Sequence, residues 1–284
     1  MQSLDAPLSK LFPEVFSIFR PVITFDVPLI VAGSILADYD FPILPIRKGG
    51  GPPGIDKEGL KLFKAIGGQQ VIRLVVKSKP EDYAKILWAP CSGIGMWLGA
   101  VEYHEGLGRL LRIFELTGFG DARVNAPSPP HGLVTLEEVV SLYRGRKLKC
   151  GLSVKEVSSQ SISIEPQATL MEAMRMMCDK RVRRLFFWGR IGEYVSDRSI
   201  LAFLFSPRIL RIAKDLPESW TNAKVSEVQS TTARSVSASA KVEDVGRMAE
   251  AGRDVFMLSD GVSLVSRWDL VMKPWKAGQL RLSQ

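Results

Sequence analysis

The alternation of apolar and polar residues repeats one order of predicted elements along the chain. In the clearest copy, residues 161–164 alternate as a strand does, and Thr169 with Glu172 forms the Ser/Thr-x-x-Glu pattern that begins a helix. Apolar residues then recur at the spacing of one helix face: Leu170, Ala173, Met174 and Met177. An apolar strand, a glycine-bounded turn, a second strand and a helix that begins at Ser196 follow. The pattern predicts a β-α-β-β-α unit.

Two neighbouring segments keep this order of elements. The second copy ends in a helix capped by Thr135, and the fourth ends in a helix capped by Ser266. Asp260-Gly261, a strong hairpin signal, separates the last two strands of the fourth copy. Strands are predicted at 121–124 and 132–134 in the second copy and at 234–237, 255–258 and 262–265 in the fourth, with helices over 107–114 and 242–249.

The first copy is less regular. Its predicted elements are strands at 21–24, 41–46 and 71–76, a helix over 29–36 and a last helix capped by Ser78. The first residue of the helix face precedes the capping residue by 49 positions in this copy and by 24 to 28 in the others. We assign the excess to a Gly- and Pro-rich insertion near 49–68, which includes a short predicted helix over 60–66.

The length of 284 residues exceeds that of one typical domain, and the repeats fill nearly all of it. We expect an α/β chain of four units over 1–86, 87–148, 149–210 and 211–284. A small sheet leaves an apolar face uncovered, so the units are expected to pack sheet to sheet and then pair to pair. The pairs are expected to stack within one chain or across a homodimer, with the polar segment 144–149 between them.

The last strand and helix of two units share a short motif, in which an apolar strand is followed by Ser or Thr, two residues and a carboxylate. It reads Gly-Leu-Val-Thr-Leu-Glu-Glu at 132–138 and Val-Ser-Leu-Val-Ser-Arg-Trp-Asp at 262–269, and short lead-in helices are predicted at 154–157 and 225–228. With this motif the unit resembles the CBS domain, a regulatory module named after cystathionine beta-synthase. The resemblance implies that the units work in two pairs, the first with the second and the third with the fourth, each pair with a pseudo-twofold axis. It also implies two clefts per pair, in which an adenosine ligand places its ribose at the motif carboxylate and its phosphates at the capped helix.

The fourth unit keeps the motif best. Ser266 and Asp269 match it, and Arg267 adds a cation at the N-terminus of the helix. Because a carboxylate accepts both hydrogen bonds of a ribose diol, we expect Asp269 to hold AMP, ADP, ATP or a related adenosyl compound in the cleft of the third and fourth units. Thr135 with Glu138 is the second candidate, with a longer carboxylate.

The third and first units depart from the motif. Ser196 is followed by Ser199, which does not replace a carboxylate, although Arg198 is available for phosphate. The first unit has Ser78 with Glu81 and is the least convincing site. All these patterns also fit plain helix capping, which stays the alternative to ligand binding.

The net charge of +8 favours anionic partners without choosing among nucleotides, nucleic acids and acidic proteins. The basic run at 180–184 ends the helix of the third unit, where cations complement the helix C-terminus or bind phosphate. Three dispersed cysteines and two histidines favour neither a disulfide framework nor a metal or catalytic site. We therefore expect no enzymatic activity and no bound metal.

The longest nearly uncharged apolar stretch, at 27–36, is too short to span a bilayer, and no secretory signal opens the chain. We expect a cytoplasmic protein without membrane contact. The presence of only two asparagines weakly favours a thermophilic source.

The leading interpretation is a regulatory protein that senses an adenine nucleotide and signals to a protein partner that the sequence does not identify. Two alternatives stay open. A structural interaction module with decayed ligand sites is favoured by Ser199 and by the irregular first copy. A nucleic-acid-binding protein is favoured by the net charge and the arginine run.

Overall fold

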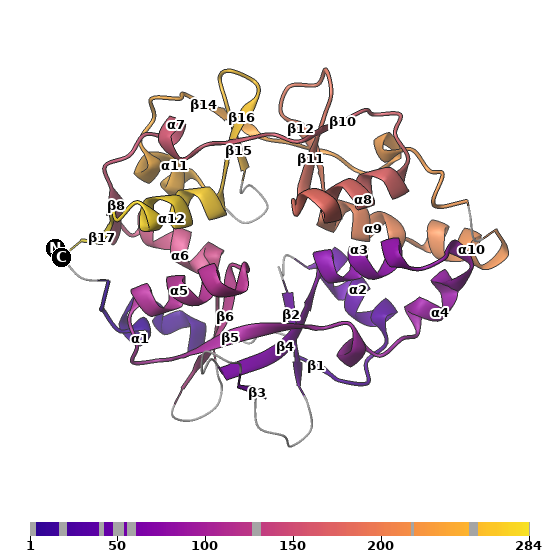
Figure 1. The fold of residues 1–284 in the computed structure, drawn as a ribbon, viewed down its shortest axis with the longest axis horizontal. Helices are drawn as coiled ribbons and strands as arrows, with labels where there is room; N and C mark the ends of the chain where they lie inside the picture. The colour runs from indigo at the N-terminus through magenta and orange to yellow at the C-terminus, as the bar shows by residue number, and fades with distance from the viewer. Residues whose placement is uncertain are drawn as a thin grey trace.

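The computed structural model describes residues 4–16, 22–39, 43–47, 54–55, 61–126, 132–216, 219–249 and 255–283. Figure 1 shows four units in a ring, with the first and second units on one side and the third and fourth on the other. The N- and C-terminal ends lie beside each other at the edge of the ring. The chain is an α/β protein of tandem units packed as two pairs, as the sequence predicts.

The third unit has the predicted elements in the predicted order. They are β10 (Ser163–Ile164), α8 (Leu170–Lys180), β11 (Arg184–Phe187), β12 (Glu193–Ser196) and α9 (Asp197–Leu204). The Thr169 hydroxyl accepts a hydrogen bond from the Glu172 amide at 3.2 Å, and the Thr169 amide donates to the Glu172 carboxylate at 2.7 Å. This reciprocal cap begins α8 where the pattern predicts it.

The fourth unit repeats the third and exchanges a strand with it. Its elements are β14 (Arg234–Val236), α11 (Val242–Met248), β15 (Val255–Leu258), β16 (Ser263–Ser266) and α12 (Arg267–Lys276). The strand that precedes the fourth unit, β13 (Thr231–Thr232), pairs with β12, and the strand that precedes the third unit, β9 (Ser159–Gln160), pairs with β16. Short helical turns lead into these strands, α7 (Val154–Val157) and η4 (Val225–Glu227). The two exchanges relate the units by a pseudo-twofold axis.

The first and second units form the other pair around one shared sheet. The first unit consists of β1 (Ile23–Thr24), α2 (Leu29–Asp38), β2 (Ile43–Arg47), β3 (Gly54–Ile55), β4 (Lys61–Gly67) and α3 (Gly68–Lys77). The second unit consists of β5 (Met96–Glu102), α5 (Leu107–Thr117), β6 (Asp121–Asn125), β7 (Gly132–Thr135) and α6 (Leu136–Arg144). The long strand β5 pairs with β4 along its first half and with β6 along its second half. It thereby joins the strands of both units into a seven-stranded sheet.

The end of the first unit differs from the prediction. Residues 71–76 lie in α3 rather than in a strand, and residues 61–66 lie in β4 rather than in a helix. The apolar run at 71–76 fits a buried helix face as well as a strand: Val71, Ile72 and Val75 are all buried on one face of α3. Ser78 follows the end of this helix, and its hydroxyl donates to the Leu74 carbonyl at 2.8 Å, so it is not an N-cap. Half of the predicted insertion near 49–68, namely 49–53 and 56–60, lies outside the described residues.

The remaining elements connect the units or flank them. They are α1 (Leu8–Leu11), η1 (Pro13–Phe16), η2 (Pro80–Asp82), α4 (Tyr83–Leu87), η3 (Cys91–Gly93), β8 (Leu148–Cys150), α10 (Pro207–Asp215) and β17 (Leu280–Leu282). β8, which joins the two pairs, forms a ribbon with β17 near the C-terminus. Among the helices of the described ranges, none is long and apolar enough to cross a bilayer.

Two large apolar clusters hold the pairs together within one chain. One joins the first unit to the third, where α2 and α3 pack against α8 and α9. The other joins the second unit to the fourth, where α6 packs against α11 and α12. Smaller clusters lie inside each pair. One surrounds Phe63 and Leu98 on the shared sheet of the first pair, and the other surrounds Phe186 and Met257 between the two sheets of the second pair.

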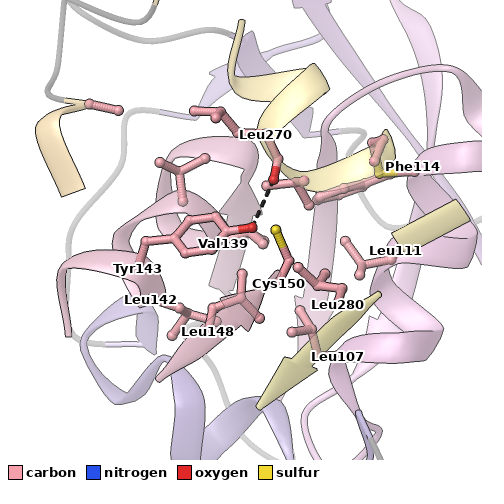
Figure 2. Packing of buried hydrophobic residues seen from close by; sticks show 14 of the residues in the cluster. Leu107, Leu111, Phe114, Val139, Leu142, Tyr143, Leu148, Cys150, Leu270 and Leu280 are labelled. Atoms are coloured by element: carbon pink, nitrogen blue, oxygen red, sulfur yellow. Dashed lines mark hydrogen bonds between the residues drawn. The ribbon is translucent and has the colours of Figure 1, made fainter. Parts of the chain in front are cut away.

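Two buried tyrosines of the first pair donate hydrogen bonds to helix carbonyls of the second pair. The Tyr143 hydroxyl donates to the Leu270 carbonyl at 2.8 Å, as Figure 2 shows, and the Tyr83 hydroxyl donates to the Leu204 carbonyl at 2.8 Å. Burial raises the pKa of both tyrosines, so both hydroxyls stay protonated. The Leu270 carbonyl lacks its usual helical donor four residues later, because Pro274 has no amide hydrogen. Tyr143 supplies that donor across the interface.

Candidate functional site

A cavity of about 340 Å³ lies where the first turns of α3, α6, α9 and α12 approach one another. This volume is within the range of small-molecule pockets, about 300–1,000 Å³. The third unit supplies most of the wall: Arg183, Arg184, Tyr194, Ser196, Asp197, Arg198, Ser199, Leu201 and Ala202. The other units add Leu36, Ala37, Gly68, Glu137, Gln229, Thr231 and Arg267. All four units therefore meet at one cavity.

The N-terminus of α9 points its first turn at this cavity. The Ser196 hydroxyl accepts a hydrogen bond from the Ser199 amide at 3.1 Å, and the Ser199 hydroxyl accepts one from the Ser196 amide at 2.8 Å. Ser199 thus fulfils the capping role of the motif carboxylate without its charge. The positive end of the helix dipole faces the cavity. The motif position carries no carboxylate, and Asp197 in the first turn offsets part of the dipole.

The charged side chains of the wall are predominantly basic. They are the four arginines Arg183, Arg184, Arg198 and Arg267 and the two carboxylates Asp197 and Glu137. Arg183 Nε lies 2.8 Å from Asp197 Oδ2, and Arg267 Nη1 lies 3.5 Å from Glu137 Oε2. The second ion pair joins the first turns of α12 and α6, which belong to different pairs of units. The excess of arginine makes the cavity suited to an anion.

Asp197 is buried at the contact between the third unit and the first. Its Oδ1 accepts the Arg198 amide at 2.9 Å, and its Oδ2 accepts Arg183 Nε. A Cβ atom at position 68 would lie 2.9 Å from Asp197 Oδ2, so any larger residue there would force the Asp197 side chain or α3 to shift. The carboxylate therefore neutralises part of Arg183 and also lies at the positive end of α3.

Three of the residues predicted from the sequence line the cavity, namely Ser196, Arg198 and Arg267. Thr135 and Glu138 do not line it. The Thr135 amide donates to Glu138 Oε2 at 2.7 Å, and the Thr135 hydroxyl accepts the amide of the next residue but one, at 3.1 Å. This pair caps α6 and places its neighbour Glu137 in the wall.

Ser266 and Asp269 also lie outside the lining of this cavity, in a bonded polar cluster. Asp269 Oδ2 accepts the Ser266 amide at 2.9 Å and the Ser266 hydroxyl at 2.7 Å. Asp269 Oδ1 accepts the Ser159 hydroxyl at 2.8 Å and lies 3.1 Å from Lys273 Nζ. Both oxygens of the Asp269 carboxylate therefore already accept hydrogen bonds from the protein or pair with its lysine.

Several residues of the wall were not singled out by the motif. Arg183 and Arg184 belong to the basic run, and Arg184 lies directly opposite Ser196 in the β11–β12 register. Thr231 lies in the exchanged strand β13, opposite Tyr194. Its place in the wall follows from the pairing of the third and fourth units. Gly68 was missed because residues 71–76 were predicted as a strand.

Neither the protein-family models nor the curated proteins contain a match to this sequence. Solved structures do match. MJ1225 from Methanocaldococcus jannaschii, described as a candidate archaeal homologue of g-AMPK, is 11% identical and covers 93% of this chain and 99% of its own, with a TM-score of 0.76. An uncharacterized conserved protein from Pyrococcus horikoshii is 15% identical and covers 90% of this chain and 96% of its own, with a TM-score of 0.52.

The CBS-pair protein CBSX2 from Arabidopsis thaliana also matches. It is 18% identical, and the match covers 45% of this chain and 97% of CBSX2, with a TM-score of 0.35. The chain has the CBS-domain fold, with four units arranged as two pairs. The resemblance carried by the sequence motif is thereby confirmed at the level of the fold. At these identities the function has to be argued from the site.

Proposed function

We propose that the protein is a non-catalytic regulator that binds an adenine nucleotide, AMP, ADP or ATP, or a related adenosyl compound, in the cavity beside α9. The observation that carries the proposal is the concentration of four arginines around a cavity of about 340 Å³ at a capped helix N-terminus. Backbone amides and the dipole of such a terminus favour phosphate. Arginine binds phosphate oxygens through two parallel hydrogen bonds.

The remainder of the wall suits the nucleoside. Leu36, Ala37, Leu201 and Ala202 offer apolar surface for a base, and the Tyr194 ring adds an aromatic face. Gln229 and Thr231 contribute polar groups from the lead-in to the fourth unit. Because Ser199 replaces the motif carboxylate, we expect binding here to depend on the phosphates more than on the ribose hydroxyls.

The position of the cavity suggests how binding would be transmitted. Its wall contains first-turn residues of both pairs, including Arg267 and Glu137, which form an ion pair across the interface. A phosphate that attracts Arg267 competes with Glu137 for the same guanidinium. Ligand binding would then shift the contact between pairs, and a protein partner that binds both pairs would sense it.

The test is calorimetric titration of the full chain with AMP, ADP and ATP, together with Arg198→Ala. A hydrogen bond to a charged group contributes about 1.5–3 kcal/mol, so this variant should bind roughly 10- to 100-fold more weakly. Arg208→Ala is the matched control, because Arg208 is exposed in α10 and pairs with Glu227 away from the cavity. Absence of heat with every adenosyl ligand, or equal affinity of Arg198→Ala and wild type, would refute the proposal.

A further inference from the structure

We propose that the Lys273 side chain fills the ligand cleft of the fourth unit, so that the third and fourth units together bind one nucleotide rather than two. The inference rests on the proposed function, since it concerns where that ligand is excluded. It starts from the polar cluster around Asp269, which is the residue that best matches the ribose-binding motif.

The strand registers identify the equivalent positions of the two clefts. Tyr194 lies opposite Thr231, and Leu264 lies opposite Ser159, and both Tyr194 and Leu264 stand two residues before a capping serine. Thr231 lines the cavity of the third unit. Ser159 therefore holds the corresponding place in the fourth unit.

A network of hydrogen bonds occupies that place. Lys273 Nζ lies 2.5 Å from the Ser158 carbonyl, 2.8 Å from the Ser159 hydroxyl oxygen and 3.1 Å from Asp269 Oδ1. The ammonium donates hydrogen bonds to the first two of these acceptors, and its contact with Asp269 is an ion pair. The Ser159 hydroxyl in turn donates to Asp269 Oδ1. The lysine thus joins α12 to the exchanged strand across the cleft.

A lysine at this helix position is peculiar to the fourth unit. Lys273 follows the motif carboxylate by one helical turn, and the corresponding residues of the first, second and third units are Leu74, Leu142 and Phe203. An apolar side chain at this place does not pair with the motif carboxylate. Lys273, by contrast, neutralises Asp269 and pairs with one of its oxygens. A ribose would have to displace an ion pair in which the carboxylate is buried and the ammonium only partly exposed.

The experiment counts ligands on the full chain by calorimetric titration with AMP and ATP. Lys273→Met removes the ammonium and keeps most of the stem, and it should add one binding event per chain to the wild-type stoichiometry. The double variant Asp269→Ala/Lys273→Met should lose that added event, while Asp269→Ala alone should bind as wild type does. Lys276→Met is the matched control on the same helix, because Lys276 pairs with Glu115 and not with Asp269. It should leave the stoichiometry unchanged.

The same variants in an Arg198→Ala background separate this inference from the proposed function. If wild type does not bind but Lys273→Met does, the site beside α9 is refuted and the role of Lys273 is supported. If Lys273→Met adds no binding event, with or without the site beside α9, the inference is overturned. Lys273→Gln provides the same test should the methionine variant fold poorly, and its melting curve verifies the fold.

Discussion

At the scale of single residues, the approach of Gly68 to Asp197 controls the geometry of the cavity wall. Asp197 holds Arg183 by an ion pair at 2.8 Å, and its other oxygen accepts the amide of Arg198. Both arginines line the cavity, so the carboxylate positions the groups that we assign to phosphate binding. The first turn of α3 comes close to this carboxylate, and a Cβ atom at residue 68 would force one of the two to shift.

We therefore expect Gly68→Ala to lower both stability and nucleotide affinity. The new methyl group would lie 2.9 Å from Asp197 Oδ2, and relief of such overpacking costs typically about 1–3 kcal/mol. Urea unfolding measures the first effect and calorimetric titration the second. Gly108→Ala is the control, because a Cβ at that helical position would meet its nearest neighbour at 3.6 Å, an ordinary contact. Equal unfolding free energies for Gly68→Ala and wild type would contradict the prediction.

At the scale of elements, α12 contains a proline that the packing of the two pairs compensates. Pro274 deprives the Leu270 carbonyl of its helical donor, and Tyr143 of α6 replaces it at 2.8 Å. A buried carbonyl without a partner costs about 1–3 kcal/mol. The packing of the second unit therefore supplies the donor that this carbonyl would lack in α12 alone.

This predicts a coupling between Tyr143 and Pro274 in a double-mutant cycle. Tyr143→Phe should lower the unfolding free energy by about 1–3 kcal/mol in the wild-type background. In a Pro274→Ala background the loss should be smaller by about 1 kcal/mol, because the amide of residue 274 then serves the Leu270 carbonyl. Chemical denaturation of the four proteins provides the values. The same loss in both backgrounds would mean that the two residues are not coupled.

Most elements of the last three units follow from the sequence, although the long strand β5 of the second unit was not predicted. The elements of the first unit follow only in part. In the later units a hydroxyl cap marks the start of each last helix, as at Thr135, Ser196 and Ser266. In the first unit the cap is Gly67, which has no side chain to signal it, and Gln70 alone completes the box. The apolar run that follows fits a strand as well as a helix, and tertiary packing decides for the helix.

The candidate site is predictable to a similar extent. The motif identifies Ser196, Arg198 and Arg267, which the fold brings to one cavity. It also makes Asp269 the preferred ribose holder, but the partners that engage this carboxylate include Ser159, which is 110 residues away. No local pattern contains that contact. Lys273, one turn after Asp269, is the part of the cluster that the sequence displays.

At the scale of the whole molecule, apolar helix faces hold the two pairs together, and these faces would be exposed to water if the pairs separated. Helices α8 and α9 of the third unit bury apolar side chains against α2 and α3, and α12 buries others against α6. Phe205 illustrates the closeness of this packing, because a Cβ atom at position 33 in α2 would lie 2.2 Å from its ring. The interface between pairs therefore resembles the interior of a domain rather than a transient contact.

From this packing we predict that the C-terminal pair, expressed alone as residues 146–284, forms a dimer through the helix faces that the first pair covers in the full chain. Large apolar patches on an isolated domain favour association, and two copies of this pair offer each other matching faces related by a twofold axis. Sedimentation equilibrium at micromolar concentration should show the dimer. Phe205→Asp in the same fragment should weaken it at least tenfold, since Phe205 lies on the uncovered face. Trp188→Asp, which alters an exposed side chain at the hairpin of the third unit, should leave it intact. A folded fragment that stays monomeric would contradict the prediction.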